Sequence, residues 1–224
     1  MSKLTVAVLG ATGLIGEQLL KLLQEDSDYE KIKVIARRPV PNDHSKIETM
    51  VIDFTNETQF ENALAGSDII FSAIGTTMKN VGGNKDLYRS IDYDIPVHAA
   101  RYGAESGCQY FGLVSSVGAD TKSSNFYLQL KGKVEETIQE MNIVSIGIFR
   151  PSMLLGNRQE FRLGEKIGKI IMATFSFLIP ANYKAIQAND VAKAMLQAAK
   201  SPGKKEIFHY KQILQLARDY DRKR

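Results

Sequence analysis

The sequence has little of what disulfide-bonded, metal-binding or membrane-spanning proteins require. Its single cysteine, Cys108, rules out a disulfide within the chain. The three histidines, His44, His98 and His209, lie far apart and have no partner at metal-ligand spacing. The longest apolar-rich run, residues 170–180, has about half the length needed to cross a bilayer. We therefore expect no metal site, no membrane span and, with no signal peptide visible in the first residues, a location in the reducing cytoplasm.

An excess of positive charge is also missing over most of the chain, because the charges of residues 1–203 balance. The net charge is +4, and residues 204–224 account for all of it, with seven lysines and arginines against three aspartates and glutamates. Proteins that bind nucleic acid along a groove carry a basic excess over their body. We therefore expect no nucleic-acid partner. A small-molecule substrate is the expected partner, and a homo-oligomer or a protein partner stays open.

What the sequence does contain is an alternation of apolar runs and helical patterns. Strand-like runs at 4–10, 33–37, 49–54, 67–75, 110–116 and 143–149 alternate with helix-like segments at 13–25, 56–66, 87–107 and 127–141. Such alternation predicts an α/β fold, a doubly wound parallel sheet with helices on both faces. Residues 1–150 would form its core. Residues 151–224 would form a small C-terminal region on the substrate side, packed on the core within a single domain.

A glycine pattern lies between the first predicted strand and the first predicted helix. Gly10, Gly13 and Gly16 are spaced three residues apart. Glycines at such a place permit a tight turn and close approach of a pyrophosphate, and the helix N-terminus supplies N–H groups and a positive dipole. The pattern therefore predicts a Rossmann-type NAD(P)-binding site.

The end of the second predicted strand indicates which dinucleotide would bind. An NAD site would have an acidic residue there, for the ribose 2′-hydroxyl, whereas this chain has Arg37 and Arg38. Guanidinium groups suit a 2′-phosphate, so we predict NADP (NADPH) in preference to NAD, with a solvated basic turn as the alternative. Asp53, after the third strand, would accept from the adenine amino group or serve a turn.

A tyrosine precedes a lysine by four residues at two places, Tyr29–Lys33 and Tyr127–Lys131. On a helix this spacing places both side chains on one face, and a nearby positive charge favours loss of the phenolic proton. Tyr29 precedes the second predicted strand, but Tyr127 starts a helix just after the carboxyl end of the fifth. Open α/β sheets bind ligands at that edge, so we predict that the second pair is the catalytic one.

Together these residues resemble the short-chain dehydrogenase/reductase superfamily, in particular its atypical NAD(P)H-binding subgroup. The resemblance covers nearly the whole chain and rests on the glycine pattern, Ile74–Thr77, Val114–Ser116, the Tyr127–Lys131 pair and Arg150-Pro151. It implies that Tyr127 is the general acid/base and that Lys131 assists it and holds the nicotinamide ribose. Ser116, or Ser115 in its place, would hydrogen-bond the substrate oxygen.

The resemblance also implies a set of cofactor contacts. The pyrophosphate would lie on Gly10, Thr12, Gly13, Leu14, Ile15 and Gly16. The 2′-phosphate would lie on Arg37 and Arg38, the ribose side beside Ala73, Ile74 and Gly75, and the nicotinamide beside Pro151 and Ser152. The family's usual fourth catalytic residue, an asparagine, has no obvious counterpart. Asp92 stands near its place, so a proton relay would differ or be missing.

The resulting hypothesis is an NADP-dependent oxidoreductase that acts on a small carbonyl or alcohol. The alternative is an NADPH-binding regulatory or protein-interaction module with little or no turnover. An epimerase with retained cofactor is disfavoured, because the region after residue 150 is short. The substrate pocket would come from residues 152–188, whose apolar side chains give no chemical signature: Met153, Leu154, Leu155, Phe161, Phe175 and Phe177.

Overall fold

The computed structural model describes residues 3–156, 183–201 and 203–223. Within them lies a seven-stranded sheet of order β3-β2-β1-β4-β5-β6-β9, in which every neighbouring pair is parallel. The strands are β1 (Leu4–Leu9), β2 (Tyr29–Ala36), β3 (Ile47–Val51), β4 (Ile69–Ser72), β5 (Tyr110–Val114), β6 (Ser145–Phe149) and β9 (Lys205–Phe208). The predicted α/β fold with a doubly wound parallel sheet is therefore confirmed.

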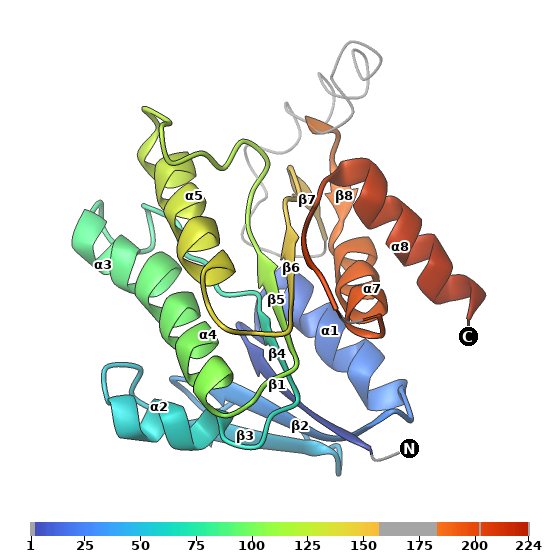
Figure 1. Cartoon of the computed structure of the whole chain (residues 1–224). Helices are drawn as coiled ribbons and strands as arrows, with labels where there is room; N and C mark the ends of the chain where they lie inside the picture. Colours follow the sequence, from blue (N-terminus) through green and yellow to red (C-terminus); the bar gives the residue numbers. More distant parts are fainter. Residues whose placement is uncertain (1–2, 157–182, 202, 224) are drawn as a thin grey trace.

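The direction of winding reverses in the middle of the sheet. From β1 the chain moves outward to β2 and β3, and it then returns to β4 on the other side of β1 and continues outward (Figure 1). Connections after β1 and after β4 therefore leave the sheet in opposite directions. In open α/β sheets this reversal leaves a crevice at the carboxyl ends of the strands, where ligands bind.

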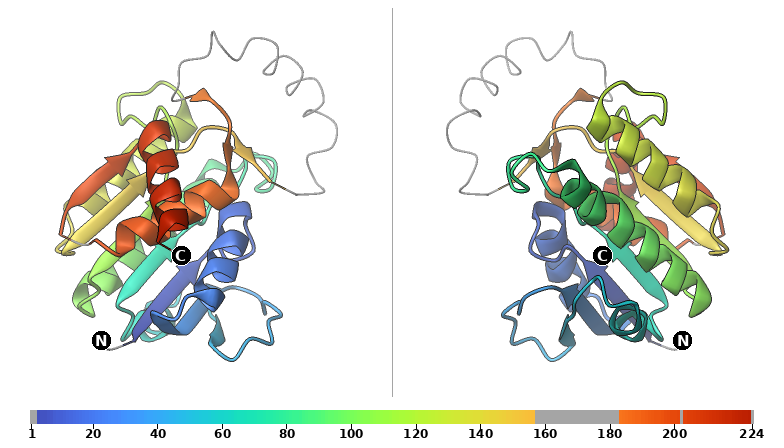
Figure 2. Two further views of the ribbon diagram at one scale, coloured as in Figure 1. Left: turned by 90° about the vertical axis from the view of Figure 1, so that its right-hand side faces the viewer. Right: turned by 90° about the vertical axis from the view of Figure 1, so that its left-hand side faces the viewer.

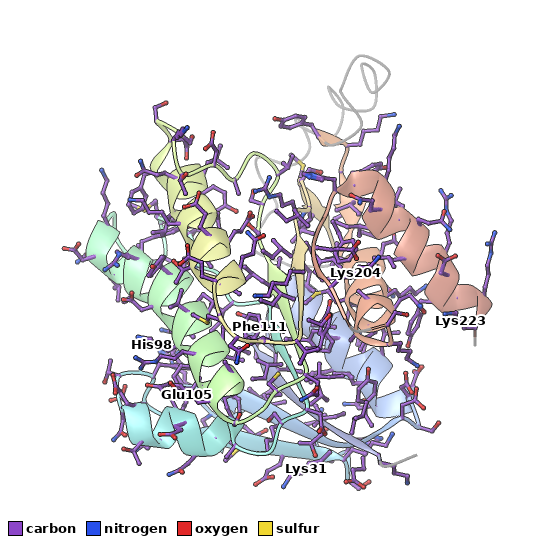
Figure 3. The ribbon with its side chains drawn as sticks, viewed as in Figure 1. Lys31, His98, Glu105, Phe111, Lys204 and Lys223 are labelled. Atoms are coloured by element: carbon purple, nitrogen blue, oxygen red, sulfur yellow. The ribbon has the colours of Figure 1, made fainter. Side chains whose placement is uncertain are left out.

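Helices cover both faces of the sheet (Figure 2). One layer holds α1 (Leu14–Glu25), α7 (Ala188–Ala199) and α8 (Tyr210–Arg222), and the other α2 (Glu57–Leu64), α4 (Ile95–Glu105) and α5 (Phe126–Gln139). Alternate residues of β1 serve the two cores, because successive side chains of a strand point to opposite faces. Val6 and Val8 pack under the first layer, and Ala7 and Leu9 under the second, which also covers Phe111 (Figure 3).

Residues after 150 complete one edge of the sheet. β9 pairs with β6, and the rings of Phe149 and Phe208 stack with their centres 4.9 Å apart. β7 (Leu154–Leu155) and β8 (Ile186–Gln187) form a separate parallel pair. The proposed boundary at residue 150 stays a prediction. Of the expected pocket residues, Phe161, Phe175 and Phe177 lie outside the described residues.

The segment predicted as one kinked helix consists of α3 (Lys85–Arg89), a π-helical turn (Ser90–Asp94) and α4. Within the turn the N–H of Ile95 donates to the carbonyl of Ser90, five residues back. Pro96 follows at the start of α4, where its missing N–H leaves an ordinary helical bond to Asp92 unmade. The turn carries the Asp92 side chain into the interior, where 1% of the residue is exposed.

The second strand starts earlier than predicted. β2 begins at Tyr29, which pairs with Leu4 at the amino-terminal end of the two strands. The first part of β2 was not predicted because charged residues interrupt it. The apolar run becomes continuous only from Val34 onward. Tyr29 therefore belongs to the strand instead of preceding it.

Candidate cofactor and catalytic site

The glycine loop between β1 and α1 is pressed against the end of β4. Gly10 has φ +81°, a left-handed conformation, and a Cβ at this position would lie 2.5 Å from the carbonyl oxygen of Ala73. A Cβ on Gly16 would collide with the carbonyl oxygen of Gly10. Only glycine fits at both positions. The motif is thus built into the packing of loop, strand and helix.

The loop leads directly into the N-terminus of α1. Gly13 is the N-cap, and its N–H donates to the carbonyl of Gly10 at 2.9 Å. The first N–H groups of a helix have no intrahelical acceptor, and together with the helix dipole they favour an anion. The predicted pyrophosphate residues, Gly10, Thr12, Gly13, Leu14, Ile15 and Gly16, all lie in this loop and first turn.

The residues predicted for the two ends of the cofactor lie after neighbouring strands. Ala73, Ile74 and Gly75 follow β4 directly, and the N–H of Ala73 donates to the carbonyl of Leu9 at 2.9 Å. Arg37 and Arg38 follow β2 directly and are exposed. The strand order places these two segments on either side of the glycine loop.

Asp53 has a structural partner of its own. Its Oδ1 accepts hydrogen bonds from the backbone N–H of Thr55 at 2.9 Å and from the Thr55 hydroxyl at 2.8 Å. These bonds, the backbone one above all, lower the pKa of Asp53. One carboxylate oxygen thus holds the turn that leads into α2, and a contact with the adenine stays a prediction.

The Tyr127–Lys131 pair lies on the first two turns of α5. The side chain of Asn125 caps this helix by accepting from the N–H of Leu128 at 3.2 Å. Tyr127 is 36% exposed, whereas Lys131 is buried one turn later. The Lys131 ammonium lies 6.0 Å from the centre of the Tyr127 ring. A reachable phenol is therefore backed by a buried positive charge.

Asp92 is the partner of that lysine. Its Oδ1 pairs with Lys131 Nζ at 3.0 Å, and its Oδ2 accepts from the backbone N–H of Thr76 at 2.7 Å. The hydroxyl of Tyr88 donates to the carbonyl of Thr76 at 3.2 Å. Burial, and next the charges of Asp92 and Tyr127, raise the pKa of Tyr88.

Sequence reasoning placed Asp92 near the expected asparagine but missed the ion pair, Thr76 and Tyr88. One signal was available, because Tyr88 and Asp92 are four residues apart and such residues share a helix face. Nothing in the sequence pointed to the backbone of Thr76, because every residue except proline has a main-chain N–H donor.

The two candidate serines have different surroundings. Ser115 is buried, and its hydroxyl donates to the carboxylate of Glu135 on α5, which also pairs with Arg150 after β6. The Arg150 Nε lies 2.9 Å from Glu135 Oε1. Ser116 is partly exposed, and its hydroxyl donates to the carbonyl of Val117 at 3.3 Å. The hydroxyl of Ser115 is thus engaged in a buried network that ties β5 and β6 to α5.

The segment after β6 closes over the end of β5. The carbonyl of Pro151 accepts from the N–H of Val117 at 2.9 Å. The hydroxyl of Ser152 donates to the carbonyl of Lys184, just before β8. Pro151 and Ser152 therefore lie beside the proposed catalytic serine, and their contact with a nicotinamide stays a prediction.

Other candidate groups lie apart from this edge. Cys108 is buried in the second core, and burial raises the pKa of its thiol to about 12. His98 lies on α4 (Figure 3), and among the described residues no three acidic, histidine or cysteine side chains are gathered so as to hold a metal ion. Over those same parts of the chain, no helix is long and apolar enough to cross a membrane.

Comparison with known proteins bears on this arrangement. Residues 10–202 match a family described as NAD(P)H-binding. The chain belongs to this NAD(P)H-binding family. It is 33% identical to protein HTATIP2 of Rattus norvegicus over 226 residues, which cover 99% of this chain and 92% of that protein. It is 35% identical to the mitochondrial protein FMP52 of Debaryomyces hansenii over 205 residues, 87% of each chain.

Solved structures show the same fold at much lower identity. A UDP-N-acetylglucosamine 4-epimerase from Methanobrevibacter ruminantium M1 matches with a TM-score of 0.71 and 16% identity, over 93% of this chain and 77% of that one. A monomeric L-threonine 3-dehydrogenase matches with a TM-score of 0.68 and 16% identity, over 94% and 80%. These structures support the fold. Together with the family match they confirm the resemblance to short-chain dehydrogenases/reductases.

The predicted cytoplasmic location is wrong. Relatives from Eremothecium gossypii, Debaryomyces hansenii and Meyerozyma guilliermondii are named as mitochondrial proteins. The prediction relied on a single cysteine and on the absence of a visible signal peptide. A single cysteine excludes a fold held by disulfides but does not distinguish one reducing compartment from another.

Proposed function

We propose that this protein is an NADPH-dependent oxidoreductase of the short-chain dehydrogenase/reductase type, acting on a small carbonyl or alcohol in mitochondria. The observation that carries the proposal is the Tyr127–Lys131 pair. The phenol is reachable from solvent, the ammonium is buried 6.0 Å from its ring centre, and both lie beside the carboxyl end of β5. This edge also holds the glycine loop. The names of the mitochondrial relatives support the location.

The residues at this edge have distinct roles in the proposal. The nicotinamide, when bound, exchanges a hydride with the substrate carbon. Tyr127 gives its phenolic proton to the substrate oxygen during reduction and takes it back during oxidation. Lys131 favours the ionised phenol by its charge. Ser116 hydrogen-bonds the substrate oxygen, and the engagement of Ser115 with Glu135 supports this choice.

The preference for NADPH rests on Arg37 and Arg38. Both are exposed, and both follow β2 directly, where an NAD site would have an acidic residue. An Arg–phosphate hydrogen bond contributes roughly 1.5–3 kcal/mol, or about ten- to hundredfold in affinity. The remaining proposed cofactor contacts are the glycine loop and first turn of α1, Asp53, Ala73, Ile74, Gly75, Lys131, Pro151 and Ser152.

Paired titrations with NADPH and NADH test the proposal directly. We expect NADPH to bind more tightly, and Arg37→Ala to weaken NADPH by about ten- to hundredfold while NADH changes little. Lys31→Ala is the matched control. It also removes one positive charge, but from β2 itself near the amino end of the strand (Figure 3), where Lys31 pairs with Glu48 at 2.6 Å.

Two other results, one from the titrations and one from a substrate screen, would change the proposal. If neither nucleotide binds, the glycine loop is only structural and the enzymatic proposal falls. If NADPH binds but no carbonyl or alcohol in a broad screen is turned over, the protein is the regulatory module described above.

A further inference from the structure

Asp92 connects two parts of the site through one carboxylate. One oxygen pairs with the Lys131 ammonium at 3.0 Å, and the other accepts from the Thr76 backbone at 2.7 Å. The Asp92 side chain is 1% exposed and that of Lys131 is 7% exposed, so water screens the pair very little. The loop after β4 and the lysine behind Tyr127 are therefore held by the same buried group.

The charge of this carboxylate opposes the charge of the lysine. A buried ammonium alone would strongly favour loss of the Tyr127 proton, because interactions between charges are large where water is excluded. An anion 3.0 Å from that ammonium offsets much of its field. The effect of Asp92 extends to a second phenol, since its charge contributes to the raised pKa of Tyr88, after burial.

We propose that Asp92 is a positioning residue that fixes Lys131 against the loop after β4 and sets the pH range in which Tyr127 exchanges its proton. The inference rests on the proposed function of Tyr127. With a neutral side chain in place of Asp92, the full charge of Lys131 acts on the phenol. Tyr127 then loses its proton at lower pH than in the native protein.

Few other charged groups act on this pair within the described residues. Three segments pack against the first turns of α5. They are α3 with Tyr88 and Lys85, the π-helical turn with Asp92, and the loop before α5 with Asp120. The Lys85 ammonium lies 5.4 Å from the centre of the Phe126 ring, and the backbone N–H of Asp120 donates to the carbonyl of Leu128 at 3.1 Å. One turn further along α5, Glu135 is paired with Arg150 from the end of β6, and these opposite charges compensate each other. Asp92 is therefore the anion that is paired directly with the Lys131 ammonium.

Asp92→Asn isolates the charge from the packing. An asparagine has the same shape, and its carbonyl oxygen can still accept from Thr76 or from Lys131. The readout is the carbon-13 chemical shift of the tyrosine ring carbon that bears the hydroxyl, followed against pH in uniformly tyrosine-labelled protein. Tyr127→Phe identifies the Tyr127 signal. This measurement needs neither a substrate nor a cofactor.

We expect Asp92→Asn to move the ionisation midpoint of Tyr127 to lower pH by on the order of one unit. Asp94→Asn is the matched control, two residues along the same turn. Asp94 is partly exposed and lies 3.9 Å from Arg89, so its removal produces no resolvable shift. An unchanged midpoint in a folded Asp92→Asn protein overturns the inference.

A double variant keeps the test decisive if Asp92→Asn does not fold. Asp92→Asn combined with Lys131→Gln removes both charges and leaves no buried ion alone. We expect its Tyr127 midpoint to lie close to the native one, because the two charges had opposed each other. A midpoint well above the native one means that Lys131 acted without opposition, and that result also overturns the inference.

Failure of the inference is distinct from failure of the proposed function. If Tyr127→Phe abolishes turnover while Asp92→Asn leaves the Tyr127 midpoint unmoved, Tyr127 keeps its role and Asp92 loses the one proposed here. If Tyr127→Phe turns over normally, the proposed function fails whatever the titration of Asp92→Asn shows.

Discussion

The chain contains the same tyrosine-lysine spacing twice, in β2 and on α5. The two copies show that the spacing brings the side chains together only on a helix. In β2, residues four apart lie on the same face but about 13 Å apart along the strand, too far to interact. On α5 the same spacing brings Cβ atoms within roughly 5–6 Å. Tyr29 and Lys33 therefore act separately, whereas Tyr127 and Lys131 form a pair.

The partners of the first copy are structural. Tyr29 is 1% exposed, and burial, followed by the charge of Asp26, raises its pKa. Lys33 Nζ donates to the carbonyls of Ala65 at 2.5 Å and Ala63 at 3.4 Å, at the C-terminal end of α2. A cation at that end of a helix satisfies carbonyls that lack helical donors and is favoured by the dipole. This copy stabilises the fold and has no reachable phenol.

The largest expected difference between the two copies is in turnover. If the proposed function holds, Tyr127→Phe lowers kcat by about 10²- to 10⁴-fold, the usual contribution of a general acid or base. NADPH affinity changes by no more than severalfold, since the phenol is proposed to contact the substrate. Tyr29→Phe, the same substitution in the other copy, leaves kcat unchanged. Steady-state rates at saturating NADPH measure this, and equal losses in both variants would contradict the distinction.

A smaller difference concerns stability. Lys131→Met leaves the carboxylate of Asp92 buried without its partner, which costs about 3–5 kcal/mol. Lys33→Met leaves carbonyl groups at the end of α2 short of a donor, which costs about 1–3 kcal/mol. Urea unfolding monitored by circular dichroism gives both free energies. If Lys33→Met lost as much unfolding free energy as Lys131→Met, Lys33 would stabilise more than the C-terminal end of α2.

The smallest effect is a pH dependence that belongs to Tyr29. The pKa of Tyr29 is raised in the folded protein above the ordinary value of 10.0. The contribution of its neutral phenol to the free energy of unfolding is therefore fully present below pH 10, and it is lost as pH rises toward the pKa of the folded state. Native protein should therefore lose up to about 1.4 kcal/mol per pH unit above pH 10 from this group. Tyr29→Phe removes that loss.

The comparison is made by urea unfolding of the native protein and Tyr29→Phe at about pH 9 and about pH 11. We expect the free energy of unfolding to fall less in Tyr29→Phe than in the native protein between the lower and the higher pH. Parallel losses in the two proteins would show that the Tyr29 hydroxyl ionises as easily in the folded state as in the unfolded chain.

Much of the fold could be predicted because its signals are local. The apolar runs of β1, β4, β5 and β6, and the glycines at 10, 13 and 16, have their meaning within a few neighbours, and the structure bears out the strand and loop positions. The beginning of β2 could not be predicted in this way. Its alternation of charged and buried residues, including Lys33, makes sense only once α2 is placed over it.

Around the candidate site, the sequence by itself determined which residue types would meet at the carboxyl edge of a parallel sheet. Order along the chain fixes which segments follow each strand, and these include the glycine loop and the start of α5. Only the tertiary structure decided which side chains are engaged elsewhere. Ser115 is hydrogen-bonded to Glu135, 20 residues further along the chain. Asp92 is paired with Lys131, 39 residues away, and accepts from Thr76, 16 residues away. Partners so far apart are selected by the packing of whole helices on the sheet, and no local pattern records that packing.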